Sequence, residues 1–358
     1  MSNEYMVQKL YQLCQNVPTP DQESATAAVT RLNQLTKPPG SLGALEALIV
    51  QLATITGNIQ PTFAHPAVLV AAGDHGVVAE HVSPFPQSVT IQMVQNFLHG
   101  GAAINALAAN AGARVIVVDA GVAGGLPDHP QLQRVAIGKG TNNLLHEPAM
   151  SRTEAMQAVL AGVELLERER EAGLDLLALG EMGIGNTTPA ACLTSAFTGA
   201  AAALTTGRGT GLDDDGLSHK QQVVAAALDR AKPDQEDPLG ILAELGGYEI
   251  ALLAGATLAA ATHCIPVVVD GYVATSAVLA AVALAPHTRD FLIAGHRSDE
   301  PGHRIALEHL GLQPLLTLDM RLGEGSGAAL ALPIIQGAAH VMRDMATFGE
   351  AGVDEKIA

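Results

Sequence analysis

Six short β-rich runs, each ending in glycine or aspartate, constrain the fold of this chain more than any other feature. The runs are Ala67–Ala72, Arg114–Val118, Leu174–Leu179, Ile265–Val269, Asp290–Ala294 and, more weakly, Leu315–Leu318. Helical stretches rich in Ala, Leu and Gln separate them. Strands that alternate with helices predict a mostly parallel sheet with helices on both faces, and hence an α/β fold.

Glycine and polar residues gather directly after these runs. The segments are Gly73–Gly76, Asp119–Gly121, Gly180–Thr188, Asp270–Tyr272, Gly295–Glu300 and Asp319–Gly327. Open α/β sheets bind their ligands at the carboxyl ends of the strands, so the pattern predicts a ligand site at that edge. Turn formation alone is an equal explanation for any single segment, because Gly and Asp are common turn residues.

Composition narrows the class of function. The 358 residues include 19 basic and 36 acidic side chains, a net charge of −17, which argues against a non-specific nucleic-acid binder. With 6 Phe, 4 Tyr and no Trp, the chain also lacks the rings of a base-stacking platform. An apolar content of 48% is enough for a sizeable core in two domains or one large α/β body. Residues 1–60 have a helical pattern, with helices expected over Ala25–Gln34 and Leu42–Thr56.

The ends and the apolar stretches bear on location. The opening MSNEYMVQKL has no basic-then-apolar signal pattern. The longest apolar stretches, Ile250–Thr262 and Val273–Pro286, fall short of the roughly 20 residues that a membrane helix needs. Cys14, Cys192 and Cys264 are too few and too far apart for a disulfide framework. We therefore expect a cytoplasmic protein that binds no membrane.

The loop Gly183–Pro189 is a candidate anion site. Its glycines let the backbone approach a ligand closely, and Thr187 or Thr188 is expected to cap a helix whose first residue is Pro189. The exposed N–H groups of such a helix start favour a phosphate. The dinucleotide fingerprint GxGxxG fails at Thr188, and no P-loop motif occurs in the chain.

A second Gly-rich segment, Gly207–Gly211, precedes Asp213–Gly216 and then Lys220. Its composition is typical of a flexible solvated loop. The functional interpretation is a second wall of the site, with Lys220 reaching a phosphate as a point charge. A divalent metal on the Asp run is disfavoured, because three adjacent Asp side chains cannot all face one ion.

Metal chemistry has one other candidate. Gly73–Gly76, with Glu80 and His81 nearby, suggests a metallohydrolase, but the chain has no HExxH spacing. His296 and His303 are separated by a Pro-Gly pair, which makes a shared helical face improbable. We expect neither a metal nor a cofactor.

Glu324 stands between glycines in Gly323–Gly327, ahead of an apolar stretch. If it is buried, its pKa rises and it becomes a candidate general base. The alternative is a carboxylate that merely benefits from the dipole at a helix start. The local sequence does not separate the two.

Taken together, these segments resemble the nicotinate-nucleotide:dimethylbenzimidazole phosphoribosyltransferase family, whose members act in the lower-ligand branch of cobalamin synthesis. The matching segments are Lys37–Gly43, Gly73–Gly76, Ser83–Gln87, Gly180–Pro189, Gly207–Asp215, Asp270–Tyr272, Gly295–Glu300 and Arg321–Gly327. The resemblance implies a Rossmann-like catalytic domain over residues 61–327. It also implies a smaller helical domain from residues 1–60 and 328–358, and a metal-free homodimer.

The resemblance further implies transfer of phosphoribosyl from nicotinate mononucleotide to dimethylbenzimidazole, giving α-ribazole phosphate and nicotinate with inversion at the anomeric carbon. Glu324 would be the catalytic base and Glu181 would assist near the ribose. The expected phosphate and nucleotide ligands are Gly183, Gly185, Asn186, Thr187, Gly209, Lys220, Asp270 and Ser298. The expected base pocket is Phe85, Gln87, Met182 and Leu322.

Three alternatives stay open at this point. One is a related phosphoribosyltransferase that prefers adenine or a phenol, and another is a non-catalytic nucleotide sensor on the same fold. The third is a metal-dependent hydrolase. Lys37–Gly43 is expected to form a rigid turn, or to pack near the active site of a partner subunit.

Overall fold

The computed structural model describes residues 2–354, and its centre is a parallel sheet of six strands in the order β3-β2-β1-β4-β5-β6. The strands are β1 (Pro66–Gly73), β2 (Arg114–Gly121), β3 (Leu132–Arg134), β4 (Leu176–Met182), β5 (Val267–Val269) and β6 (Leu292–Ala294). Every pair of neighbours in this sheet is parallel. The predicted α/β class is therefore confirmed.

The sheet separates two apolar layers, and the fully buried β1 contributes to both. Leu69 packs with one layer and its neighbours Val68 and Val70 with the other, as the period of two in a strand requires. One layer contains α6 (Arg152–Glu171), α7 (Thr187–Thr198), α9 (Asp214–Ala231), α10 (Pro238–Leu245), α11 (Tyr248–Thr262), α12 (Tyr272–Leu284) and α13 (Pro301–Leu310). The other contains α2 (Gln22–Gln34), α3 (Ala44–Thr56), α4 (Ser88–Leu98), α5 (Ala103–Asn110) and α14 (Ser326–Asp344).

The two apolar stretches noted in the sequence form the buried helices α11 and α12. Helix α11 approaches α6 closely through glycines: a Cβ on Gly162 would collide with the Leu252 carbonyl, and one on Gly255 with the Val159 carbonyl. Within residues 2–354, no helix combines the length and the apolar character that crossing a membrane requires.

The predicted strand at Leu315–Leu318 does not join the main sheet. It shortens to β8 (Leu316–Thr317), which pairs with β7 (His296–Arg297) in a separate two-stranded sheet. The sixth strand of the main sheet is β3 instead, which the sequence analysis missed because only one of its three residues is buried. The Asp290–Ala294 run also begins late, since residues 286–291 form a 3₁₀ helix.

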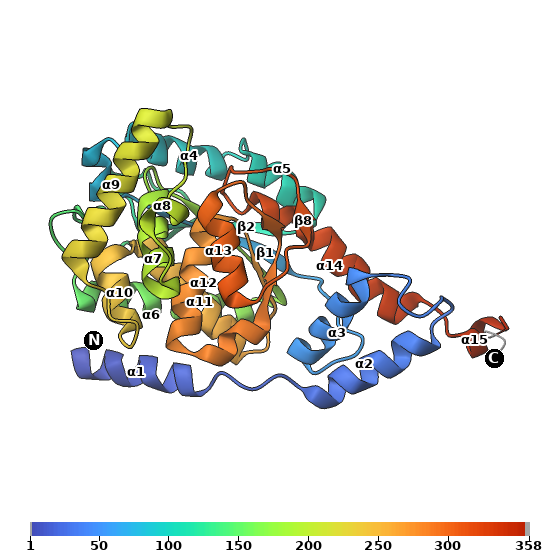
Figure 1. Ribbon diagram of the computed structural model, residues 1–358. Coiled ribbons are helices and arrows are strands. Elements are labelled where there is room, and N and C mark those ends of the chain that lie inside the picture. The colour runs from blue at the N-terminus through green and yellow to red at the C-terminus, as the bar shows by residue number, and fades with distance from the viewer. Residues whose placement is uncertain (1, 355–358) are drawn as a thin grey trace.

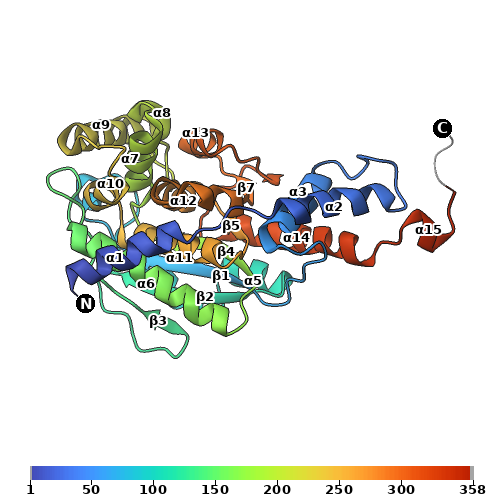
Figure 2. The ribbon, with the colours of Figure 1, turned by 90° about the horizontal axis from the view of Figure 1, so that it is seen from below.

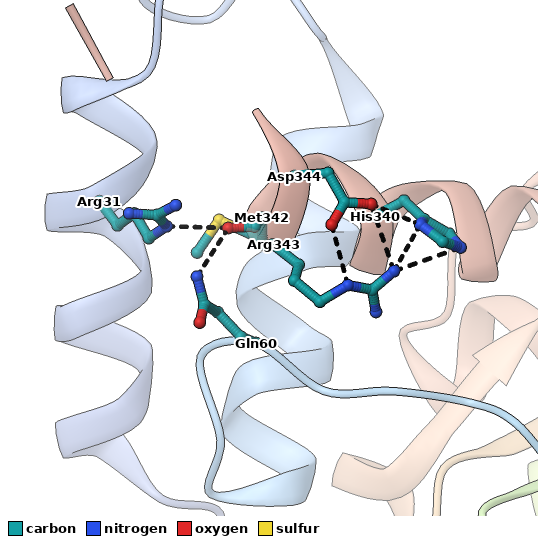
Figure 3. A network of polar contacts seen from close by, with 6 residues as sticks. All are labelled: Arg31, Gln60, His340, Met342, Arg343 and Asp344. Atoms are coloured by element: carbon teal, nitrogen blue, oxygen red, sulfur yellow. Dashed lines mark hydrogen bonds and ion pairs between the residues drawn. The ribbon is translucent and has the colours of Figure 1, made fainter. Parts of the chain in front are cut away.

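Segments from the two ends of the chain lie together. Figure 2 shows α2, α3 and the C-terminal half of α14 side by side, on the way to α15 (Phe348–Ala351). The Met342 carbonyl accepts a hydrogen bond from Arg31 Nε (2.8 Å) and one from Gln60 Nε2 (3.2 Å), as Figure 3 shows. An antiparallel bridge between Leu35 and Thr347 adds a further link.

Helix α1 (Asn3–Gln15), which the sequence analysis did not predict, packs elsewhere. Lys9 pairs with Glu164 of α6 at 2.8 Å, and Met6 and Leu10 join the apolar layer that contains α6. In Figure 1, α1 and α2 consequently lie under opposite ends of the molecule. The division of the chain at residues 60 and 328 stays a prediction.

The Lys37–Gly43 segment turns the chain into α3. Lys37 is buried and its Nζ pairs with Glu46 Oε1 at 2.8 Å, while the same oxygen accepts the Leu42 N–H. Gly40 and Gly43 have φ angles of 75° and 56°, which glycine adopts readily. The contacts of Glu46 and the two glycine conformations thus hold this segment in a rigid turn. Proximity to a partner's active site stays a prediction.

Candidate active site

A cavity lies at the carboxyl edge of the sheet, where the polar segments after the strands were predicted to meet. Its walls come from residues within 181–187, 209–210, 271–273, 296–300 and 321–323. The predicted residues in its walls are Glu181, Met182, Gly183, Asn186, Thr187, Gly209, Ser298 and Leu322. Segments separated by more than a hundred residues in the chain thus share one hollow, because parallel strands end at a common edge.

The loop after β4 turns sharply into α7. The helix begins at Thr187 with Asn186 as its N-cap, so the predicted cap at Thr187 or Thr188 is wrong. Pro189 is consequently the third residue of the helix, still within the first turn where its missing N–H is tolerated. The Asn186 side chain makes no capping bond and instead donates from Nδ2 to Glu181 Oε2.

Glu181 is buried in the cavity wall at the end of β4. Burial raises its pKa to about 8, and the nearby charges of Asp270, Glu249 and Glu324 add to the effect. Gly323 lies against the carboxylate so closely that a Cβ there would collide with Glu181 Oε1. Burial therefore favours the protonated form of Glu181.

Glu324 is carried by an unusual backbone. Gly323, Glu324 and Gly325 all have left-handed φ angles, of 83°, 65° and 86°. The carboxylate is buried, with 6% of the residue exposed, and burial raises its pKa. Its Oε2 accepts the N–H of Ile104 at 3.4 Å, in the first turn of α5. The burial that the first interpretation requires is present, and the role of Glu324 as a base stays a prediction. The helix start that donates to its carboxylate is that of α5 and not that of the following helix α14.

Asp270 holds the turn that carries Glu324. Its Oδ1 accepts the N–H groups of Gly327 (2.7 Å) and Ala328 (2.9 Å), and its Oδ2 accepts that of Gly325 (3.2 Å). The side chain is buried beneath this turn and does not line the cavity. Its predicted contact with a nucleotide stays a prediction, while its contact with the turn of Glu324 is direct.

Lys220 lies behind the cavity wall, against the wall residue Thr187. It is fully buried on α9, and its Nζ donates to Thr187 Oγ1 at 2.6 Å. Burial lowers its pKa to about 8, while the charge of Glu300 acts in the opposite direction. A Cβ on Gly209 would lie 3.2 Å from Nζ, so the glycine loop passes directly over the ammonium group.

The glycine loop is not the solvated loop that its composition suggests. Gly207 and Gly209 are buried, and the Gly209 N–H donates to Glu300 Oε1 at 2.8 Å. The Asp run starts helix α9, since Asp213 Oδ1 accepts the Gly216 N–H at 2.8 Å and Asp214 pairs with Arg208. A helix start explains these carboxylates without a metal.

Sequence reasoning left other wall residues without a role. Tyr272, His296, Glu300 and Arg321 all line the cavity. Each lies in, or directly adjoins, a segment that the sequence singled out, but no local motif marks these side chains. Burial and proximity to the cavity are the signals that identify them.

A histidine outside the cavity wall, His303, holds the backbone of Ser298. His303 Nδ1 accepts the Ser298 N–H at 2.8 Å, which leaves the ring proton on Nε2 to donate to Thr275 Oγ1 at 2.9 Å. Burial, together with the charge of His296, lowers the pKa of His303 to about 3. The imidazole is thus a neutral, fixed support for the loop.

Besides Lys220, Asp270 and Glu324, three predicted residues lie outside the cavity wall. Phe85 is 47% exposed, Gln87 Nε2 donates to the His75 carbonyl at 3.5 Å, and Gly185 packs against Val78. The segment of Phe85 nevertheless borders the cavity, because Ser83 Oγ lies 3.3 Å from the hydroxyl of the wall residue Thr210.

The Gly73–Gly76 motif forms a buried ion pair. His75 Nε2 lies 2.7 Å from Glu249 Oε1, and both side chains are fully buried. Burial alone would lower the pKa of His75, but the charge and hydrogen bond of Glu249 outweigh it and raise the pKa. Within the described residues 2–354, no group of three or more His, Cys, Asp or Glu side chains is placed to hold a metal ion.

Comparisons with known proteins agree with this geometry. A family model described as "Phosphoribosyltransferase" matches residues 17–353. A nicotinate-nucleotide–dimethylbenzimidazole phosphoribosyltransferase of Chloroflexus aurantiacus is 52% identical over 337 residues, which are 94% of this chain and 96% of that one. The enzyme of the same name from Dehalococcoides mccartyi is 47% identical over 336 residues, again 94% of this chain and 96% of that one. The crystal structure of the Thermus thermophilus enzyme superimposes with a TM-score of 0.90 at 49% identity, covering 94% of this chain and all of that one.

Proposed function

The chain belongs to the nicotinate-nucleotide–dimethylbenzimidazole phosphoribosyltransferase family, and from this premise we propose the reaction that its cavity performs. The protein transfers phosphoribosyl from nicotinate mononucleotide to 5,6-dimethylbenzimidazole, and the products are α-ribazole phosphate and nicotinate. One observation carries the proposal: the wall of a single cavity contains Glu181 and Gly323, which adjoins the buried Glu324, and also Thr187 and Gly209, which contact the buried Lys220.

The leaving group of this reaction needs no general acid. In nicotinate mononucleotide the pyridine nitrogen is quaternary and cationic, and it departs as neutral pyridine without needing a proton. The lone-pair nitrogen of the benzimidazole attacks the anomeric carbon from the opposite face, so the β linkage becomes α. The attacking ring then carries excess positive charge until its N–H proton is removed.

We assign to Glu324 the role of taking that proton. Burial raises its pKa, which makes it a stronger base than an exposed glutamate, and the hydrogen bond from Ile104 orients its carboxylate. Asp270 fixes the turn beneath it through three backbone N–H groups. The protein thereby holds the base within a rigid frame before the substrates arrive.

Glu181 stabilises the positive charge that develops on the ribose. Burial favours the protonated carboxyl group, whereas a cationic nucleotide beside it favours the ionised form. Binding of the substrate therefore releases a proton and creates the carboxylate that the transition state needs. The bond from Asn186 keeps the group aimed while its charge changes.

The remaining walls divide between the phosphate and the base. Lys220, Thr187 and the N–H groups of the two glycine loops are the proposed phosphate ligands, together with Ser298. Met182 and Leu322 line the cavity on the side of the carboxylates and are proposed to contact the benzimidazole. Phe85 and Gln87 would reach the base from the bordering segment that carries Ser83.

We propose further that the protein is a homodimer in the cytoplasm. Tyr5, Val7 and Tyr11 of α1 are apolar or aromatic side chains that are each more than half exposed, which suits a subunit contact. Light scattering after size exclusion measures the oligomeric state. A monomer at micromolar concentration would contradict the proposal.

Release of nicotinate tests the proposed reaction. The protein is incubated with nicotinate mononucleotide, with and without dimethylbenzimidazole, and nicotinate and α-ribazole phosphate are quantified by chromatography. We expect release that depends on the base and that a chelator does not change. Release without any base would indicate a hydrolase, and no release at all would indicate a nucleotide sensor. Faster reaction with adenine or a phenol would assign a different acceptor.

A further inference from the structure

Glu300 lies among the proposed phosphate ligands, although its carboxylate is negatively charged, like the phosphate itself. It is the N-cap of α13, lines the cavity and has only 6% of its surface exposed. Its Oε1 accepts the N–H of Gly209 at 2.8 Å. Its Oε2 is buried and has no hydrogen-bond partner among residues 2–354.

Two cations favour the ionised form of this carboxyl group. Burial raises the pKa of Glu300, while the charges of Lys220 and Arg321 and the hydrogen bond from Gly209 act in the opposite direction. Arg321 Nη1 also donates to the Gly209 carbonyl at 3.2 Å, so the arginine and the glutamate hold the same residue of the loop. The buried ammonium group of Lys220 thus has Glu300 as its counter-charge in the empty cavity.

Space around the carboxylate is tight. A Cβ on Gly207 would collide with Glu300 Oε2, and one on Gly209 would lie 2.9 Å from Thr187 Oγ1. The N–H of Gly209 has room for one acceptor, and Glu300 is that acceptor in the empty cavity. A phosphate that binds Gly209 and Lys220 has to take the place of this carboxylate.

We propose that Glu300 occupies the phosphate position of the empty protein and is displaced when the nucleotide binds. This inference rests on the proposed function, because it assumes that the phosphate binds Gly209 and Lys220. The carboxylate keeps Lys220 charged and the glycine loop folded in the empty state. A phosphate dianion replaces the carboxylate at the Gly209 N–H and supplies the negative charge beside Lys220, whereas a ligand without a phosphate leaves Glu300 in place.

Affinity measurements with matched ligands test the proposal. Binding of nicotinate mononucleotide and of nicotinate riboside, which lacks the phosphate, is measured by calorimetry at about pH 6.5, below the pKa of Lys220. Glu300→Gln keeps an oxygen for the Gly209 N–H but removes the competing charge. We expect the Kd for the mononucleotide to fall about tenfold and the Kd for the riboside to stay unchanged, because like charges in one site oppose binding.

Glu308→Gln is the matched control, since it removes a carboxylate from an exposed position on the same helix, outside the cavity wall. It should leave both affinities unchanged. If Glu300→Gln weakens mononucleotide binding or leaves it unchanged, Glu300 is a fixed support of the loop and the proposal is wrong. An equal gain for the riboside also contradicts it. Failure of the wild type to bind the mononucleotide would instead overturn the proposed function on which the inference rests.

A crystal structure of the wild type with ribose 5-phosphate tests the same point without a mutation. The proposal requires that the Glu300 carboxylate leaves the Gly209 N–H and that a phosphate oxygen replaces it. A structure with the phosphate bound and the carboxylate still on Gly209 would overturn the proposal.

Discussion

Two groups of buried charge adjoin the cavity: Glu181 and Glu324, which we call the carboxylate end, and Lys220 and Glu300, which we call the phosphate end. At the carboxylate end, Glu181 and Glu324 are held by neutral donors, and each meets further negative charge from Asp270. At the phosphate end, Lys220 is buried next to an internal counter-charge, Glu300. The first end thus brings acidic groups together, which suits a cationic ring. The second end is already neutralised, so an incoming phosphate has to exchange with what is there.

The largest effect on activity is expected when the proposed base, Glu324, is removed from the carboxylate end. Glu324→Gln keeps the side-chain volume and should lower kcat about 1,000-fold, within the range that a general base contributes. The Kd for nicotinate mononucleotide should change by less than about twofold, because the carboxylate acts on the benzimidazole proton and not on the nucleotide. Single-turnover kinetics and calorimetry measure the two quantities.

Glu308→Gln on the exposed side of α13 is the control for that variant, since it removes a carboxylate far from the cavity wall. Near wild-type turnover in Glu324→Gln would show that Glu324 is not the base. The contrast between the carboxylate end and the phosphate end would then fail.

The next test removes the cation from the phosphate end. Lys220→Met keeps an unbranched side chain in the buried space but loses the charge, and it should raise the KM for the nucleotide about 30-fold. The value of kcat should change little, because the phosphate is remote from the reacting bond. Lys139→Met, at an exposed position, is the control for loss of one positive charge. An unchanged KM would exclude Lys220 from the phosphate site.

A smaller effect is expected from crowding the carboxylates. Gly323→Ala places a Cβ against Glu181 Oε1 at a position with a φ angle of 83°. Displacement of Glu181 should lower kcat/KM about tenfold, since small misplacements of a charged group weaken transition-state contacts. Gly337→Ala in α14 has open space around its Cβ and serves as the control. Full activity in Gly323→Ala would show that the position of Glu181 is not critical.

The smallest effect concerns stability and pH. The pKa of Glu181 is about 8 when folded, against an ordinary value of 4.5, so between these values the folded protein keeps a proton that the unfolded chain releases. Stability contributed by this proton is lost as the pH rises through that window. The free energy of unfolding of Glu181→Gln should therefore gain on the wild type from pH 5 to 8.5, by on the order of 1 kcal/mol.

Denaturant titrations at each pH measure that difference. The exposed Glu236→Gln should show a difference from the wild type that does not vary with pH. Lys220→Met should show the opposite sign: since the pKa of Lys220 falls from 10.5 to about 8 on folding, the wild type gains stability relative to the variant as the pH rises between these values. If the stability difference between variant and wild type does not vary with pH at either position, folding shifts neither pKa.

Much of this arrangement was predictable from the sequence. The strands β1, β2 and β4 are long apolar runs, and a run of this kind that ends in glycine has few other folds open to it. The short β3 was not predictable, because its three residues show no pattern that distinguishes them from a loop. The small sheet of β7 and β8 was missed for the same reason.

The site was predictable as a set of segments and less so as a set of contacts. The sequence placed Glu181, Gly183 and Gly209 in one site, and the structure brings them into one cavity. It did not reveal that Glu324 lies against the start of α5, since that contact joins residues 220 positions apart. The role of Glu300 was equally hidden, because only the fold places its carboxylate on the Gly209 N–H.

At position 324, the proposed catalytic role and the stability of the fold favour different residues, because residues 323–325 all have left-handed φ angles. A glutamate there is strained, since glycine or asparagine adopts a positive φ at lower energy, and its burial as an anion adds a second penalty. Random mutation followed by selection for folding alone would therefore replace the carboxylate. Directed evolution of this protein for heat resistance is likewise expected to discard Glu324 early, unless each round also demands turnover.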